Sequence, residues 1–203
     1  MNIYIIRHGE TDYNVERRFQ GMWGESKLTE RGKSQAEAAK QLIENITFDR
    51  IYSSAAIRTR ETSAILFPER DDILFSDDLR EIDVGSLTNR IVSQYRERMP
   101  EKFEIVDKTQ GYDIFGGESC EAIDERAKSV VARILANGGE EIAVVSHGGF
   151  ICHLMAALFD LPRKHFAICD NCGVSLVTVK EGQSVLAFYN RIAEESINPN
   201  GAY

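Results

Sequence analysis

Residues 142–146 form an apolar run that ends in a serine, and this run constrains the fold more than any other segment. A strand that is apolar on both faces is typical of a parallel sheet covered by helices on either side. Residues 3–7 have a similar character up to Arg7. Strand-like and helix-like patterns alternate along the chain, and this alternation predicts an α/β fold with a mainly parallel central sheet.

The other predicted elements come from periodicity and capping residues. Thr29 and Ser119 are predicted N-caps of amphipathic helices. The first helix is expected over residues 30–44, and the second ends at the glycine pair that starts with Gly138. Further elements are a strand at 48–53, helices at 56–66 and 150–158, and a hairpin of 173–179 with 185–189. Residues 87–117 show one helix, near 91–99.

No internal repeat, low-complexity segment or Pro/Gly-rich linker interrupts the 203 residues. The sequence therefore predicts a single domain over residues 1–203. Its tail, 194–203, carries little signal and is expected to be loose.

Charge and cysteine usage exclude several classes of protein. The formal net charge of -8 disfavours a nucleic-acid partner. The apolar runs are too short to span a bilayer, so no membrane partner is expected, and the N-terminal run lacks the basic leader of a secretory signal. The four cysteines do not resemble a secreted disulfide framework. Reduced thiols and a cytoplasmic location are expected, and the sequence allows a homodimer.

Two histidines directly follow predicted strands. His8 comes after the strand at 3–7, and His147 comes after the strand at 142–146. Ligands of open α/β sheets bind outside the carboxyl ends of the strands, so both histidines are expected to face one crevice. The glycines that follow them, Gly9 and Gly148, let the backbone approach a ligand closely.

Two arginines could share that crevice. Arg7 precedes His8, and Arg58 lies at the start of the helix after the strand at 48–53. Guanidinium groups bind phosphate oxygens and would repel a metal cation, so the pattern favours a dianionic ligand and no metal or other cofactor. Nearby positive charge also keeps an imidazole neutral, with a lone pair free to attack phosphorus.

An acid is then needed for the leaving alkoxide, and Glu81 is the candidate. A carboxyl group beside a phosphate retains its proton more readily, because the two negative charges repel. Asp83 is a competitor for this role, and an ion pair of Glu81 with Arg80 or another arginine is the structural alternative.

Several motifs occur in a fixed order over residues 1 to about 190. They are Arg7-His8-Gly9-Glu10-Thr11 with Asn14, Arg18-Phe19-Gln20-Gly21, Leu28-Thr29 with Gly32, Ser53-Ser54 with Arg58, Leu79 with Glu81 and Gly85, Gly116-Gly117-Glu118-Ser119, and Val145-Ser146-His147-Gly148-Gly149. In this combination the chain resembles the histidine phosphatase superfamily, the phosphoglycerate-mutase-like proteins.

The resemblance implies a three-layer α/β/α sandwich and hydrolysis of a small phosphorylated metabolite. It implies that His8 becomes phosphorylated and that Arg7, Arg58 and His147 hold the phosphoryl group. Glu81 would act first as general acid and then as general base.

The resemblance also implies a substrate site. Asn14 would assist the phosphate pocket, Gln20 and Gly21 would line the substrate mouth, and the backbone of Gly148 would approach the ligand. Residues 25–29 and 86–89 depart from the family pattern where substrate contacts are expected. The substrate itself therefore stays open.

The sequence leaves alternative functions open, both among enzymes and outside them. A phosphoglycerate mutase is the alternative enzyme, and a phosphate-binding sensor without activity is the alternative outside enzymes. Cys169 and Cys172 would suit a zinc or redox role, although buried thiols are favoured for a single Cys-x-x-Cys pair. Phe19 and Trp23 suit either a lid over the substrate or ordinary packing.

Overall fold

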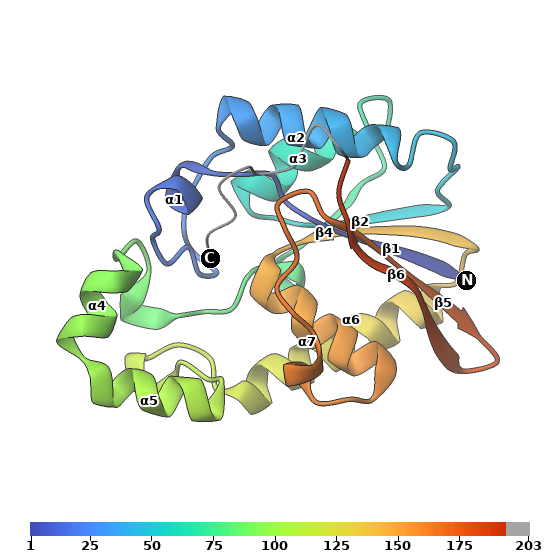
Figure 1. Ribbon diagram of the computed structural model, residues 1–203. Coiled ribbons are helices and arrows are strands. Elements are labelled where there is room, and N and C mark those ends of the chain that lie inside the picture. Colours follow the sequence, from blue (N-terminus) through green and yellow to red (C-terminus); the bar gives the residue numbers. More distant parts are fainter. Residues whose placement is uncertain (194–203) are drawn as a thin grey trace.

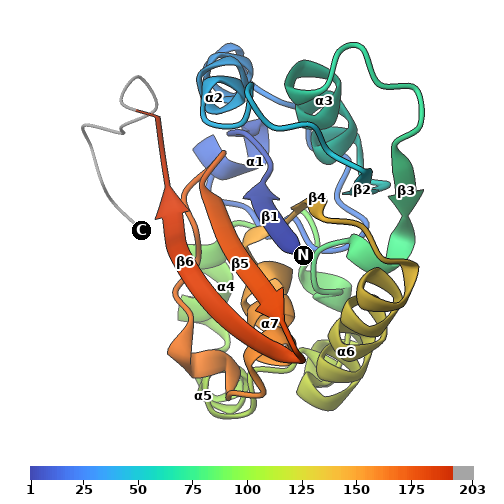
Figure 2. The same ribbon diagram turned by 90° about the vertical axis from the view of Figure 1, so that its right-hand side faces the viewer.

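A six-stranded sheet forms the centre of the structure, a computed structural model that describes residues 1–193 (Figure 1). The strands are β1 (Asn2–Arg7), β2 (Arg50–Ser54), β3 (Leu74–Ser76), β4 (Glu141–Ser146), β5 (Val174–Lys180) and β6 (Gln183–Arg191), in the spatial order β3-β2-β4-β1-β5-β6. The pairs β3–β2, β2–β4 and β4–β1 are parallel, whereas β5 is antiparallel to β1 and to β6. Figure 2 shows β6 and β3 at opposite edges. The prediction of a mainly parallel sheet is confirmed.

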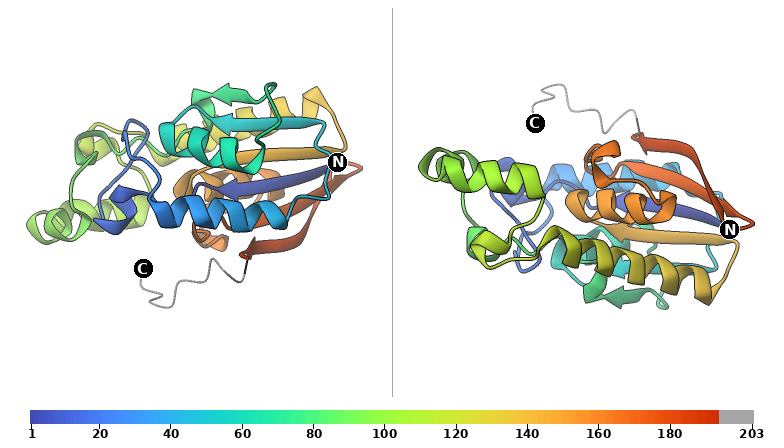
Figure 3. Two further views of the ribbon diagram at one scale, coloured as in Figure 1. Left: turned by 90° about the horizontal axis from the view of Figure 1, so that it is seen from above. Right: turned by 90° about the horizontal axis from the view of Figure 1, so that it is seen from below.

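Helices cover both faces of this sheet. Helices α2 (Glu30–Gln41) and α3 (Ile57–Leu66) lie on one face, and α6 (Cys120–Asn137) and α7 (Gly148–Phe159) lie on the other (Figure 3). The three-layer sandwich is therefore confirmed. The short helix α1 (Asp12–Val15) and the helices α4 (Val92–Arg98) and α5 (Pro100–Thr109) lie beyond the carboxyl end of β1 (Figure 1).

The core has two parts because the sheet is buried on both faces. In β1, Ile5 packs with the α6 and α7 side of the core, whereas the next residue, Ile6, packs with the α2 and α3 side. In β4, Val144 and Val145 divide in the same way. Successive side chains of a strand point to opposite faces, so a central strand here must be apolar throughout.

The predicted caps are in place. The Thr29 hydroxyl accepts a hydrogen bond from the Gly32 amide at the start of α2, and the Ser119 hydroxyl accepts one from Ala122 at the start of α6. Helix α6 ends before Gly138, whose φ is +67°. The helix predicted at 30–44 stops earlier, at Gln41, and the other predicted elements differ from the observed ones at their ends.

Several elements were not predicted, among them helix α1, the edge strand β3 and helix α5. The edge strand β3 has only three residues and leaves Leu74 and Phe75 exposed. Helix α5 starts at Pro100 and buries only Phe103 and Val106, so its apolar stripe is short. The loose tail predicted at 194–203 lies outside the described residues, and the single domain over 1–203 stays a prediction. Within residues 1–193, no helix has the length and apolar character that a membrane crossing requires.

Candidate active site

The two histidines emerge side by side from the sheet. Arg7 and Ser146 are partners in the parallel pairing of β1 and β4, so His8 and His147 leave the sheet at the same level. The His8 amide donates to the Ser146 carbonyl at 3.0 Å, and the two ring centroids are 5.2 Å apart. The two rings therefore lie side by side, as the sequence predicted.

His8 has one nitrogen committed and one free to react. Its Nδ1 lies 2.7 Å from the carbonyl oxygen of Gly9, which can only accept, so Nδ1 carries the hydrogen and Nε2 the lone pair. The side chain is 2% exposed. Burial, followed by the charges of Arg58 and Arg7, lowers the pKa of His8 well below its ordinary value. The ring is therefore neutral at neutral pH and has a nucleophilic nitrogen.

His147 is oriented by partners on both nitrogens. Its Nδ1 accepts from Nε of Arg58 at 3.1 Å, so Nε2 carries the hydrogen and donates to the Ser54 hydroxyl at 2.8 Å. Burial, then Arg58 and His8, lowers the pKa of His147 well below its ordinary value. No role for Ser54 could be predicted from the sequence, although the serine pair at the end of β2 marked its position.

Arg58 is fully buried and connects this histidine to a distant loop. Its two terminal nitrogens donate to the carbonyls of Gly21 and Gly24 at 3.0 and 2.9 Å. Burial lowers the pKa of Arg58 to about 10, so the group is still cationic at neutral pH. Arg60, two residues further along α3, is exposed.

Arg7 retains donor capacity next to the start of α7. Its Nη1 donates to the Cys169 carbonyl, whereas its Nε is buried and has no partner among the described residues. A Cβ at Gly148 would lie 3.2 Å from that Nε and 2.8 Å from Ile168. Glycine therefore keeps the guanidinium close to the N-terminus of α7, where backbone amides also favour anions.

Glu81 sits at that same helix end. Its Oε2 accepts from the Gly149 amide at 3.1 Å, and its Oε1 accepts from Phe150 at 2.9 Å. The ion pair with Arg80 considered above does not form, since Arg80 pairs with Asp77. Asp83 is turned elsewhere and accepts from the Gly85 amide and from the indole of Trp23.

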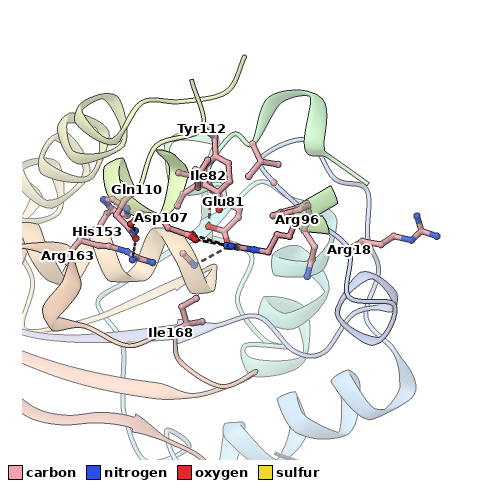
Figure 4. A pocket seen from close by; sticks show the side chains of 16 residues that line it. Arg18, Glu81, Ile82, Arg96, Asp107, Gln110, Tyr112, His153, Arg163 and Ile168 are labelled. Atoms are coloured by element: carbon pink, nitrogen blue, oxygen red, sulfur yellow. Dashed lines mark hydrogen bonds and ion pairs between the residues drawn. The ribbon is translucent and has the colours of Figure 1, made fainter. Parts of the chain in front are cut away.

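A cavity of about 350 Å³ opens beside Glu81 (Figure 4). The predicted substrate residues Gln20 and Gly21 are in its wall, and so is Phe19, which stacks on Phe103. Several further wall residues were not predicted from the sequence, among them Asp107, Gln110, Tyr112, His153, Arg163 and Ile168. Arg96, at an exposed position of α4, also lines the cavity.

Trp23 is not part of this wall. Its side chain is 57% exposed and lies over the Arg80 guanidinium at 5.2 Å. Phe19 therefore packs and lines the cavity, whereas Trp23 lies on the surface.

The side chain of Asn14 mainly caps the N-terminus of its own helix, α1. Its Oδ1 accepts from the backbone and hydroxyl of Thr11 at the cap of α1, and from Asn171 at 3.4 Å. Within the described residues its amide nitrogen has no hydrogen-bond partner, so that atom is the part a ligand could use.

The Cys-x-x-Cys segment supports the nucleophile through its backbone. The amide of Cys172 donates to the carbonyls of Arg7 and His8, and the side chain of Asn171 donates to His8 as well. The Cys169 and Cys172 side chains lie in different parts of the core, and burial raises the pKa of Cys172 to about 12. Among residues 1–193 no group of three His, Cys, Asp or Glu side chains could hold a metal ion.

Comparisons with known proteins show the family of this chain. The family model of the histidine phosphatase superfamily (branch 1) matches residues 3–192. A "probable phosphoglycerate mutase GpmB" of Salmonella paratyphi A is 33% identical over 90% of this chain and 87% of that protein. A "probable 2-carboxy-D-arabinitol-1-phosphatase" of Arabidopsis thaliana is 29% identical over 97% of this chain, which spans only 42% of that longer protein. A mycobacterial glucosyl-3-phosphoglycerate phosphatase solved with VO3 has a TM-score of 0.84 and 27% identity, covering 93% of this chain and 98% of that one.

Arg58 generates the first prediction. In Arg58→Gln, the buried carbonyls of Gly21 and Gly24 lose charged donors, and the free energy of unfolding should fall by about 2–4 kcal/mol. Loss of a positive charge makes protonation of the neighbouring imidazoles easier, so the pKa values of His8 and His147 should rise. Denaturant unfolding and histidine titration by NMR measure the two effects.

Arg60→Gln is the matched control, because Arg60 is exposed on the same helix. Arg60 donates to the Ala55 carbonyl and lies over the Phe75 ring, both at the surface. Arg60→Gln should therefore leave the histidine pKa values unchanged and lower the free energy of unfolding by no more than about 1 kcal/mol. Unchanged histidine pKa values in Arg58→Gln would contradict the electrostatic role of Arg58.

Proposed function

We propose that this chain, which belongs to branch 1 of the histidine phosphatase superfamily, hydrolyses phosphomonoesters through a phosphorylated His8. The comparisons support the enzyme class, since two of the relatives above are described as phosphatases. One observation carries the mechanism: among the described residues the Nε2 lone pair of His8 has no partner, and the ring is subject to the positive charges of Arg58 and Arg7.

The phosphoryl group would lie between His8 and the start of α7. Nε of Arg7 is a buried donor without a partner among the described residues, which favours an anionic oxygen at that point. Arg58 adds a fixed positive charge, and His147 presents a ring held by Arg58 and Ser54. These preorganised groups would stabilise the charge that develops on the transferring phosphoryl group.

Two displacements complete the reaction. In the first, His8 Nε2 forms a bond to phosphorus as the ester P–O bond breaks, and Glu81 gives its proton to the departing alkoxide. In the second, Glu81 takes a proton from water, the water oxygen attacks phosphorus, and the N–P bond breaks. Phosphate is released and His8 returns to its neutral state.

Glu81 is placed to serve both steps. It lines the cavity, and the amides at the start of α7 hold its carboxylate in one orientation. A bound phosphate brings negative charge next to this carboxylate, which favours its protonated form and prepares the acid step.

A mutase is the second candidate, because one relative is described as a phosphoglycerate mutase. A mutase must hold its substrate in two orientations and exclude water between them. In mutases resembling this chain the acid is followed by Arg-His-Tyr-Gly, whereas Glu81 is followed by Ile82-Asp83-Val84-Gly85. That segment supplies no cation, so hydrolysis is the proposal that we favour.

The setting of the enzyme is part of the proposal. We propose that it works in the cytoplasm on a small phosphorylated metabolite, without a metal or organic cofactor. Its four cysteines are free thiols, which supports a reducing compartment. The homodimer allowed by the sequence stays a prediction.

Replacement of the nucleophile tests the proposed function most directly. His8→Ala should reduce turnover of any phosphomonoester to the background rate, because no other nitrogen occupies that position. Wild-type enzyme quenched during turnover of labelled substrate should yield a phosphoprotein that is labile in acid and stable in base. The exposed His165→Ala is the control and should keep full activity. An acid-stable label, or activity in His8→Ala, would refute the mechanism.

The acid is tested by leaving-group dependence. Glu81→Gln keeps an oxygen for the amides of α7 but cannot donate a proton as an acid does. The rate with alkyl phosphates should fall about 10²–10⁴-fold, and that with nitrophenyl phosphate by less than about tenfold. Asp83→Asn, which changes the neighbouring carboxylate, should affect both esters equally and weakly. Equal large losses in Glu81→Gln on both esters would show that Glu81 only positions the site.

Hydrolysis and isomerisation can be separated in one assay. With 3-phosphoglycerate, release of phosphate should exceed isomerisation whether or not 2,3-bisphosphoglycerate is present. The assay follows both products over the same time. Isomerisation that depends on the bisphosphate and outpaces phosphate release from every ester tried would replace the hydrolase with a mutase.

A further inference from the structure

Arg163, in a short 3-10 turn (Arg163–His165), is a cation without a countercharge in the cavity wall. Its Nη1 donates to the side chain of Gln110, and its Nε is buried without a partner in the described part of the chain. Figure 4 shows its side chain beside those of Gln110 and His153. Within residues 1–193 it forms no ion pair, so its charge is available to a ligand.

The other cations of the wall are committed. Arg96 binds both oxygens of Asp107 at 3.0 Å. Arg18 pairs with Glu16, donates to the Asn89 carbonyl and points away from the other wall residues in Figure 4. Among the described wall residues, Arg163 is therefore the cation whose charge is unbalanced.

His153 adds a second unpartnered nitrogen to the same wall. Its side chain is 1% exposed, and its Nδ1 lies 2.6 Å from Asp124, which fixes the hydrogen on Nδ1. Its Nε2 is buried and has no partner among the described residues. A buried polar atom without a hydrogen bond costs stability, so this wall is suited to a polar ligand. With the hydrogen on Nδ1, Nε2 can only accept, so it would receive a hydrogen bond from a hydroxyl group of the ligand, and the anionic group would be bound by Arg163.

The position of His153 on α7 sets the distance between the general acid Glu81 and a group bound near Arg163. The amide of Gly149 binds Glu81, and His153 lies four residues further along the same helix face. Four residues of helix rise by about 6 Å. A group bound near His153 and Arg163 would therefore be only a few atoms away from the ester oxygen that Glu81 protonates.

We propose that Arg163 binds a second anionic group on the leaving alcohol, so that the preferred substrates are short phosphomonoesters carrying a carboxylate or a second phosphate. This assignment rests on the proposed function, because it places the leaving group in the cavity beside Glu81. Arg163 would hold such a substrate in one orientation, which is all that hydrolysis requires.

The experiment compares esters that differ only in charge. The carboxylate pair is 3-phosphoglycerate and glycerol 3-phosphate, and the phosphate pair is propane-1,3-diyl bisphosphate and 3-hydroxypropyl phosphate. We expect wild-type kcat/KM to be at least about tenfold higher for the charged member of one or both pairs. The pair that shows the preference identifies the anion.

Arg163→Gln should remove that preference, with a loss of at least about tenfold on the charged ester and less than about threefold on the neutral ester and on nitrophenyl phosphate. Arg163→Lys, which keeps the charge, should restore part of it. Lys164→Gln, at an exposed position next to Arg163, is the control and should match wild type.

The outcomes separate the two proposals. No preference for charge in the wild type, or equal losses on all esters in Arg163→Gln, would overturn the anion subsite while nitrophenyl phosphate is still hydrolysed through His8. Absence of His8-dependent hydrolysis of nitrophenyl phosphate would instead overturn the proposed function.

Discussion

The buried charge of Arg58 is the constraint on which the rest of the site depends. Moving a guanidinium out of water is costly unless its N–H groups find acceptors. Here the acceptors are two backbone carbonyls and Nδ1 of His147, and all three are neutral. The hydrogen bonds are satisfied but the charge is not balanced, since no carboxylate pairs with Arg58 among residues 1–193. A second cation, Arg7, lies in the same site. Burial together with the resulting positive field keeps His8 and His147 neutral, and the field favours a dianionic ligand.

The pairing of the strands positions the two histidines for reaction. Parallel pairing of β1 and β4 brings His8 and His147 to the same level through backbone hydrogen bonds. The turn that ends at Cys172 then holds the backbone of His8 from the side of β5. The nucleophile is thus fixed by backbone bonds from two neighbouring strand ends, while its Nε2 remains uncommitted. Preorganisation of this kind lowers a barrier because little movement is needed when the bond to phosphorus forms.

The sequence predicted the parts of the site that follow a periodic element. His8 and His147 could be placed because each ends an apolar strand, and Arg58 because it starts a helix after another strand. The cavity wall could not be found in this way. His153 and Arg163 come from α7 and the turn after it, and Gln110 from the end of a helix that the pattern did not reveal. The Cys-x-x-Cys segment was hard to interpret for a different reason. Its contribution lies in backbone hydrogen bonds, which depend on the fold. Such bonds do not require particular side chains, so the residue types do not predict them.

An acidic protein can bind an anionic ester because the two charges act over different distances. The net charge of -8 is spread over the whole chain and is screened by salt within about 8 Å at physiological ionic strength. Arg7 and Arg58 act from within the fold, beside the position of the phosphoryl group, where screening is weak. Arg163 is only partly buried and lies further from His8, in the cavity wall. Arg7 and Arg58 would therefore bind the phosphoryl group, which all phosphomonoesters share. Arg163 would distinguish between the alcohols that these esters carry. Catalysis and substrate selectivity would thus depend on different arginines.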